Sequence, residues 1–229
     1  MPLRLIVFDL DDTLYLERDF VKSGFKAVGD YLHSLGTIDS DAFFKTAWAL
    51  FEDGARGSIF NQALDILGNP VSNELIAELI AVYRQHQPAI IAFEDAGNLL
   101  QMLKRQKIIL ALISDGPVQT QKNKLGALGL TGFFEHIILT EYYGITWRKP
   151  SPTSFLAVMH SAQVEAHQCS YVADNPRKDF WAPNILGWHS VRLRDKQGLY
   201  YQETSPPGGE PQDTVGDFKT LCQLLLKNI

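Results

Sequence analysis

The chain opens on the stretch LRLIVFDLDDTLY, Leu3–Tyr15, in which an apolar run leads directly into a group of acids. The continuous apolar run Leu5–Phe8 predicts a strand buried on both faces, as in a parallel sheet. Asp9, Asp11 and Asp12 follow within four positions, and carboxylates that close repel one another. Such crowding needs a cation, a bound proton or good exposure. The rest of the sequence must therefore explain why acids gather at the end of a strand.

The overall composition is that of an ordinary globular chain with a mild acidic excess. Of its 229 residues, 45% are hydrophobic and 21% are charged, and the formal net charge is −5. The length suits one large domain or a core domain with a smaller second one. The negative charge argues against a nucleic acid partner. An anionic substrate would have to be held by a few local cations, a metal and backbone N–H groups.

The cysteines and the apolar runs of the sequence indicate where in the cell the protein is expected to lie. Cys169 and Cys222 lie far apart and lack the spacing of metal ligands, which favours a reducing, cytoplasmic setting. Only a short apolar run precedes Asp9, so we expect no signal peptide. No apolar run approaches the ~20 residues of a membrane span, so we expect no membrane partner.

A long region after the first strand has helical periodicity. Apolar residues such as Val21, Phe25 and Val28 recur at spacings of three and four, and four such segments predict four helices. We therefore expect residues 16–92 to form an inserted all-helical domain, with residues 1–15 and 93–229 forming the core.

From about residue 93 the pattern changes to alternating helices and strands. The predicted strands are Ile108–Ser114, His136–Thr140, Ser170–Asp174 and His189–Arg194. The stretch Asp195–Gly216 is rich in Gly, Pro and Gln and is interpreted as a loop before a closing helix. The alternation predicts an α/β fold with a Rossmann-like, doubly wound parallel sheet. Such sheets bind ligands outside the carboxyl ends of their strands.

Polar clusters follow the ends of four of these strands. Asp9 follows the first strand, Ser114–Gly116 ends the second, Lys149 lies in the loop after the third, and Asp174 ends the fourth. The carboxyl ends of parallel strands share one edge of a sheet, so these clusters are predicted to form one site. This placement explains the acids of the opening stretch in outline.

The residue types suit phosphoryl chemistry. Asp9 can be a carboxylate nucleophile, and Asp11 can protonate a leaving oxygen and later activate water. Asp174 offers a hard oxygen ligand for Mg²⁺. Ser114 can bind phosphate, and Lys149 can act as a point charge.

Each residue taken alone has an ordinary alternative. The acids and Ser114 also suit turns or helix caps, and a lone lysine such as Lys149 is usually a solvated surface residue. The ordered set of acid-x-acid, Ser, Lys and acid, each at a strand end, is far more informative than its parts.

Four motifs in this order resemble those of the haloacid dehalogenase superfamily, in its phosphatase branch. They are DLDDT (Asp9–Thr13), LISDG (Leu112–Gly116), RKPSP (Arg148–Pro152) and YVADNPRKD (Tyr171–Asp179). The helical region also lies where that family places a cap, so the resemblance spans nearly the whole chain. Ala173 departs from the Gly that many members have there, and we expect local crowding at most.

The resemblance implies roles for named residues. It implies catalytic roles for Asp9, Asp11 and Lys149. Phosphate or substrate binding, with support of the loop, is implied for Thr13, Ser114, Asp115 and Gly116. A Mg²⁺ site is implied for Asp9, Asp11, Asp174 and Asp179. Asp11 would offer the metal its backbone carbonyl, and Asp179 would contact the metal's ligands rather than the metal itself.

The second acid also separates branches of this superfamily. Dehalogenating members lack an acid at the place of Asp11, so its presence favours phosphoryl transfer. Phosphonate-cleaving members also lack it and need a cap lysine as an amine nucleophile. The cap lysines here are Lys22, Lys26 and Lys45.

Substrate choice is expected to reside in the cap, because the core handles only the phosphate. Arg56 lies between two glycines in FEDGARGSIF and is a candidate for holding a second anionic or hydroxyl group of the substrate. The alternative is a Gly-rich turn with a solvated arginine.

These features together predict a Mg²⁺-dependent phosphatase that acts on a small phosphorylated metabolite, a sugar phosphate or nucleoside monophosphate, through an aspartyl-phosphate. The expected partner is this small molecule, and the chain is expected to be a monomer or homodimer. The alternatives are a phosphosugar mutase of the same superfamily and a catalytically idle binding or regulatory protein on this fold.

Overall fold

The computed structural model describes residues 2–227 and residue 229, which divide into two compact units. The α/β unit comprises the segment that ends at Glu17, Ile91–Gln121, and the chain from Leu128 onward. The helical unit comprises Arg18–Ile90 together with Lys122–Ala127. Helix α6 (Val118–Leu128) therefore contributes residues to both units.

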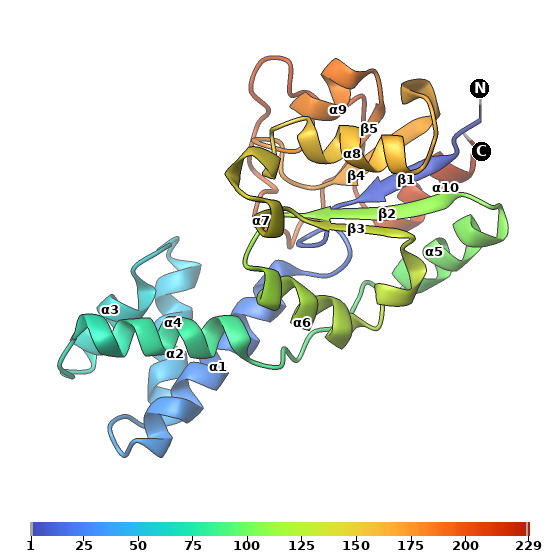
Figure 1. The fold of residues 1–229 in the computed structure, drawn as a ribbon. Coiled ribbons are helices and arrows are strands. Elements are labelled where there is room, and N and C mark those ends of the chain that lie inside the picture. The colour runs from blue at the N-terminus through green and yellow to red at the C-terminus, as the bar shows by residue number, and fades with distance from the viewer. Residues whose placement is uncertain (1, 228) are drawn as a thin grey trace. The chain divides into compact units, whose positions relative to one another are not determined.

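The α/β unit is built on a six-stranded sheet in which all described pairings are parallel (Figure 1). Its strands are β1 (Leu5–Phe8), β2 (Ile109–Ser114), β3 (His136–Leu139), β4 (Cys169–Ala173), β5 (His189–Leu193) and β6 (Asp213–Val215), in the order β3-β2-β1-β4-β5-β6. The chain builds outward from β1 through β2 and β3, returns to the other side of β1, and builds outward again through β4 to β6. This is the doubly wound, Rossmann-like order, and the predicted fold class is confirmed.

Helices cover both faces of this sheet. The α/β unit contains α5 (Ala96–Arg105), α7 (Thr140–Tyr143), α8 (Thr153–Ser161), α9 (Trp181–Leu186) and α10 (Phe218–Lys227), and the 3₁₀ turns η1 (Thr131–Phe133), η2 (Ile145–Trp147) and η3 (Ala166–Gln168). Helices α8 and α9 lie on one face, and α5 and α10 lie on the other (Figure 1). The strands are thus shielded from water on both sides, which explains their continuous apolar runs.

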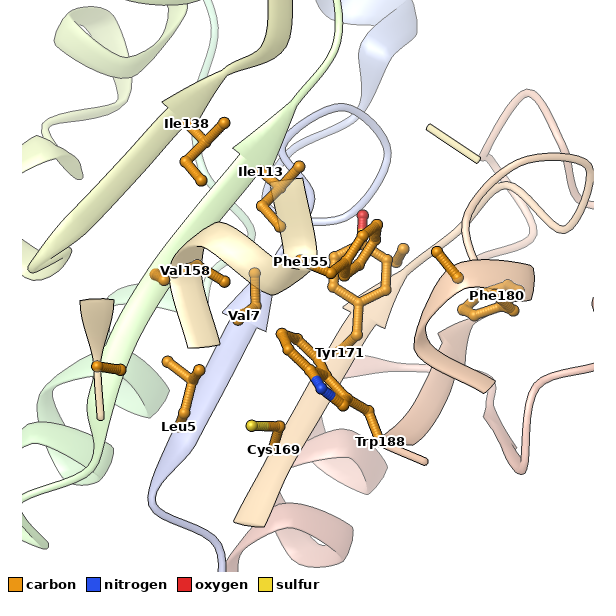
Figure 2. Close-up of a cluster of buried hydrophobic side chains, with 14 residues drawn as sticks. Leu5, Val7, Ile113, Ile138, Phe155, Val158, Cys169, Tyr171, Phe180 and Trp188 are labelled. Carbon is orange, nitrogen blue, oxygen red and sulfur yellow. The ribbon is translucent and has the colours of Figure 1, made fainter. Parts of the chain in front are cut away.

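The core beneath α8 and α9 also supports the site. Alternate residues of the central strands, such as Val7 of β1 and Tyr171 of β4, point toward Phe155 of α8 and toward Trp188 (Figure 2). The Phe155 ring meets the Tyr171 and Trp188 rings edge-on, at centroid distances of 4.9 Å and 5.6 Å. Tyr171 therefore has its ring fixed in the apolar core, which fixes the position of its hydroxyl.

Strand β6 was not predicted, because it lies inside the stretch that was interpreted as a loop. It has three residues, and Val215 is the one that is buried, so there is too little alternation to indicate a strand. The loop before β6 is nevertheless anchored. The Arg192 guanidinium donates to the backbone oxygens of Tyr200 and Glu203.

The helical unit contains the four predicted helices. They are α1 (Glu17–Ser34, whose first residue lies in the α/β unit), α2 (Ser40–Glu52), α3 (Ile59–Ile66) and α4 (Asn73–Gln85). An aromatic cluster holds them together, with the Phe25 ring 6.0–6.2 Å from those of Phe51, Phe60 and Tyr83. In the described part of the chain, no helix is long and apolar enough to cross a membrane.

Removing a buried indole should destabilise the α/β unit strongly. Trp188 is fully buried, whereas Trp181 is 41% exposed. We expect Trp188→Ala to lower the free energy of unfolding by about 3–5 kcal/mol, because it leaves a large cavity. Trp181→Ala is the matched control and should cost roughly 1 kcal/mol or less. Urea unfolding of both variants checks this, and equal losses would contradict the packing described above.

Candidate active site

The parallel order of the strands brings four chain segments to one edge of the sheet. Phe8 of β1 pairs with Val172 of β4, and the Asp9 N–H donates to the Val172 carbonyl at 2.9 Å. Asp9 and Asp174 therefore leave neighbouring strands at the same edge. Ser114 ends β2 beside the end of β3, from which the chain continues toward Lys149.

Lys149 lies at the centre of this edge. Its ammonium Nζ lies 2.8 Å from Asp9 Oδ1, 2.8 Å from Asp179 Oδ1 and 3.0 Å from the Tyr171 hydroxyl. An ammonium has three N–H donors, and these contacts give each of them an acceptor. The side chain is fully buried, so Lys149 is not the solvated surface residue that a lone lysine suggests. Burial disfavours its charge, but Asp179 and Asp9 outweigh burial and raise its pKa well above the usual value.

Three buried carboxylates gather at this edge, where the Lys178 ammonium acts on Asp9 and Asp179 in addition to Lys149. Asp9, Asp174 and Asp179 each offer an oxygen within 4.8 Å of the others. Burial raises the pKa of Asp9 to about 6, against the opposing effect of Lys149. Burial and the nearby charges of Asp179 and Asp9 raise the pKa of Asp174 well above its usual value. The three carboxylates thus offer more negative charge than Lys149 and Lys178 together neutralise.

The three acids differ in the hydrogen bonds they accept. Asp179 Oδ1 contacts Lys149, and its Oδ2 accepts from the Asn175 N–H at 2.9 Å. Asp174 Oδ1 accepts from the Thr13 hydroxyl at 3.5 Å, but its buried Oδ2 has no partner among the described residues. An unpartnered buried oxygen beside other carboxylates fits a divalent cation, since hard oxygens are the ligands that Mg²⁺ prefers. The Asp11 carboxylate lies outside this group of three.

Asp11 is held at both of its carboxylate oxygens. The Tyr15 hydroxyl donates to Oδ1, and the Gln121 amide nitrogen donates to Oδ2 at 2.9 Å. The same Gln121 nitrogen lies 2.5 Å from Ser114 Oγ and 3.0 Å from the Asp115 carbonyl oxygen. Gln121 was not predicted from the sequence, because a glutamine on a helix has the pattern of a surface residue.

The predicted phosphate-binding turn follows β2. Gly116 has a φ of +123°, a backbone conformation that side-chain-bearing residues rarely adopt. The Asp115 carboxylate accepts from the Thr140 hydroxyl at 2.7 Å and from the Lys149 N–H at 3.3 Å, and it lies 3.5 Å from Lys178 Nζ. Burial alone would raise the pKa of Asp115, but Lys149 and Lys178 outweigh it and lower the pKa. The Asp115 side chain thus supports the Lys149 loop, and its contact with substrate stays a prediction.

Asp12 fixes the turn that carries the first acids. It has a φ of +49°, and its carboxylate accepts from the Glu17 and Leu199 N–H groups, each at 2.7 Å. These bonds tie the start of α1 and the loop before β6 to the turn. Asp12 is therefore explained as a structural residue of the motif, although it is an aspartate like Asp9 and Asp11.

Arg56 belongs to the helical unit, where its guanidinium has local partners. It donates to the Phe51 and Ala55 carbonyls at 2.9 Å and 2.7 Å and lies over the Phe51 ring. Of the lysines in the predicted cap, Lys22 lies over the Trp48 ring and Lys26 pairs with Asp30. A substrate contact by Arg56 stays a prediction.

Comparison with known proteins assigns the family. The family model for haloacid dehalogenase-like hydrolases matches residues 6–191 of the chain. The chain belongs to this family, and the predicted membership is confirmed.

Several relatives with similar sequences are named as phosphatases. The chain is 24% identical over 223 residues to a glyceraldehyde 3-phosphate phosphatase of Methanopyrus kandleri, covering 95% of this chain and 92% of that one. It is 26% identical to a phosphoserine phosphatase of Thermus thermophilus, and the match covers 72% of this chain and 62% of that one. It is also 26% identical to a phosphoglycolate phosphatase of Pseudomonas putida, and the match covers 83% of this chain and 69% of that one. These names agree with the prediction of a phosphoric monoester hydrolase.

Solved structures share the fold. The HAD-hydrolase YfnB from Bacillus subtilis, bound to magnesium, matches with a TM-score of 0.72 at 18% identity, covering 98% of this chain and 99% of that one. A 2-haloacid dehalogenase from Pseudomonas syringae matches with a TM-score of 0.64 at 22% identity, covering 98% and 99%.

The buried Asp9 should make metal-free stability depend on pH. Its pKa is about 6 in the folded chain against 3.8 ordinarily, so the folded state holds this proton more tightly. The contribution to stability is therefore full below about pH 4 and is lost as the pH rises through about 6. In chelator, we expect the wild type to lose on the order of 2–3 kcal/mol more than Asp9→Asn across this range.

Unfolding free energies measured at several pH values between 4 and 7 test this expectation. Asp65→Asn, at an exposed carboxylate of α3, is the control and should follow the wild type. Parallel pH curves for wild type and Asp9→Asn would contradict the burial argument.

Proposed function

We propose that this chain is a Mg²⁺-dependent phosphatase that hydrolyses a small phosphorylated metabolite through an aspartyl-phosphate. The observation that carries the proposal is Asp9, a buried carboxylate at the end of β1 that lies 2.8 Å from the Lys149 ammonium. Asp11 lies two positions further along, with both oxygens held by donors. A nucleophile, an acid/base and a fixed cation are what phosphoryl transfer through an enzyme carboxylate requires.

The proposed reaction has two steps. In the first, an Asp9 oxygen attacks phosphorus, the bond from phosphorus to the leaving oxygen breaks, and Asp11 gives that oxygen its proton. In the second, Asp11 takes a proton from water, the water oxygen attacks phosphorus, and the bond to Asp9 breaks. Inorganic phosphate leaves, and Asp9 and Asp11 return to their starting states.

Charge is the main obstacle to the first step, because a carboxylate must approach an anionic phosphate. Lys149 offsets the charge of Asp9 at 2.8 Å in a buried place where screening by water is weak. Ser114 and the backbone around Gly116 would bind phosphoryl oxygens. Thr13 supports Asp174 through its hydroxyl.

Asp9 and Asp174 would hold the metal, together with the backbone carbonyl of Asp11, while Asp179 orders the cluster through Lys149. The unpartnered Asp174 Oδ2 is the atom that favours this assignment. Bound Mg²⁺ would supply positive charge between the nucleophile and the phosphoryl group.

For the substrate we propose a small sugar phosphate or a similar metabolite. The phosphatases related to this chain are named for glyceraldehyde 3-phosphate, phosphoserine and phosphoglycolate, which are all small phosphate esters. In this proposal the helical unit is the cap that selects the rest of the substrate, and Arg56 is its candidate contact. Two free cysteines, Cys169 and Cys222, support a reducing, cytoplasmic setting.

The direct test is release of inorganic phosphate from a panel of sugar phosphates, other small phosphate esters and nucleoside monophosphates. We expect activity with Mg²⁺, loss of activity in excess chelator, and no turnover by Asp9→Asn. Asp65→Asn should retain the wild-type rate. Full activity in chelator would contradict the metal, and wild-type turnover by Asp9→Asn would contradict the nucleophile.

Lys149 should matter for both rate and stability. Lys149→Met removes the charge beside Asp9, and loss of one donor to a charged transition state typically costs ~10²–10³ in kcat. It also leaves Asp9 and Asp179 without their buried partner, at a cost of about 3–5 kcal/mol. Assays are therefore run where thermal unfolding shows the variant to be folded, with the exposed Lys219→Met as control. An unchanged kcat in folded Lys149→Met would remove Lys149 from the mechanism.

A further inference from the structure

We propose that Gln121 and Tyr15 are positioning residues for proton transfer by Asp11, and that Gln121 couples this acid/base to the phosphate-binding hydroxyl of Ser114. The inference rests on the proposed phosphatase function and adds two residues to it. Both side chains contact Asp11 directly, and they come from different parts of the chain.

The Gln121 amide is the centre of this arrangement. The residue is 1% exposed, and its nitrogen lies 2.9 Å from Asp11 Oδ2, 2.5 Å from Ser114 Oγ and 3.0 Å from the Asp115 carbonyl oxygen. An amide nitrogen has two hydrogens, so these three acceptors share two donors. Burying an amide is costly unless it is hydrogen-bonded, and the partners that satisfy this nitrogen are groups of the proposed site, which argues against a bystander role.

The contact with Ser114 has a consequence for phosphate binding. A hydroxyl has one hydrogen and two acceptor lone pairs. When Ser114 Oγ accepts from Gln121, its own hydrogen stays available to a phosphoryl oxygen. Gln121 therefore orients Ser114 as a donor while it holds Asp11 as an acceptor.

Tyr15 holds the other oxygen of Asp11. Its side chain is fully buried, and its hydroxyl donates to Asp11 Oδ1. An ionised carboxylate can only accept hydrogen bonds, so the phenol is the donor in this contact. The Tyr15 backbone also forms bridges with Asp11 and Ala92, which fix the ring at its base.

Donors on both oxygens stop the Asp11 carboxylate from rotating. A general acid/base must lie within hydrogen-bond reach of the proton it moves, and a misplacement of about 1 Å can cost ~10²-fold in rate. A loss of positioning should therefore slow the steps that need a proton more than the steps that do not.

The identity of the leaving group separates these steps. An alkyl phosphate needs a proton from Asp11 on its leaving oxygen in the first step. In 4-nitrophenyl phosphate, the leaving group departs as a stable anion, so the first step needs no proton. The second step needs Asp11 as base for either substrate.

The test compares Gln121→Met and Tyr15→Phe with wild type on glycerol 3-phosphate and 4-nitrophenyl phosphate, by steady-state and rapid-mixing assays. Gln101→Met, at an exposed glutamine of α5, is the matched control. We expect both positioning variants to lose roughly 10- to 100-fold in kcat on glycerol 3-phosphate. On 4-nitrophenyl phosphate at saturating concentration we expect both variants to give a burst of about one nitrophenolate per enzyme, because the proton-dependent second step is slowed most. Gln121→Met should also raise KM for both substrates, because Ser114 loses the donor that orients it.

Three other outcomes would overturn the inference. Wild-type rates in both variants would show that neither donor matters. Equal losses on both substrates without a burst would show a merely structural role. If the wild type releases phosphate at no measurable rate from these two substrates and from every member of the phosphate-ester panel, the proposed function itself fails. Thermal unfolding identifies folded variants, and either variant alone gives the diagnostic pattern if the other does not fold.

Discussion

The ion pair network of Lys149 is the interaction on which the rest of the site depends. One buried ammonium contacts Asp9, Asp179 and the Tyr171 hydroxyl, and each contact is 3.0 Å or shorter. Removing two carboxylates from water is costly unless a partner compensates them. Lys149 and the nearby Lys178 compensate part of this charge, and the buried Asp174 keeps one unpartnered oxygen. The imbalance is the physical reason for proposing a divalent cation.

The strand order explains why these groups meet. Because β1 lies between β2 and β4, Asp9 follows the central strand, with Ser114 on one side and Asp174 on the other. The carboxyl edge of a doubly wound sheet is thus the place where one carboxylate, that of Asp9, can be reached by groups from three further loops. Tyr171 connects this edge to the core, since its ring packs against Phe155 while its hydroxyl contacts Lys149 (Figure 2).

Much of this arrangement could be predicted from the sequence, for physical reasons. A strand buried on both faces leaves a continuous apolar run, so β1 and β2 were predicted to within a residue, and polar residues at strand ends marked the site. Strand β6 is too short to show alternation. The sequence did not indicate a role for Gln121, because that role comes from its contacts with Asp11 and Ser114. Asp11 lies far away in the sequence and Ser114 belongs to a different element, so no sequence pattern predicts these contacts. The burial of Lys149 likewise follows from its acidic neighbours, which only the fold assembles.

The most direct test of the central claim is the stabilisation of the protein by Mg²⁺. A ligand that binds the folded chain raises its melting temperature by mass action. The account predicts that millimolar Mg²⁺ raises the melting temperature of the wild type and of Asp65→Asn, more at pH 7.5 than at pH 5, which lies below the Asp9 pKa of about 6. It also predicts that Asp174→Asn loses most of this response. A wild type that does not respond to Mg²⁺, or an Asp174→Asn variant that responds equally, would contradict it.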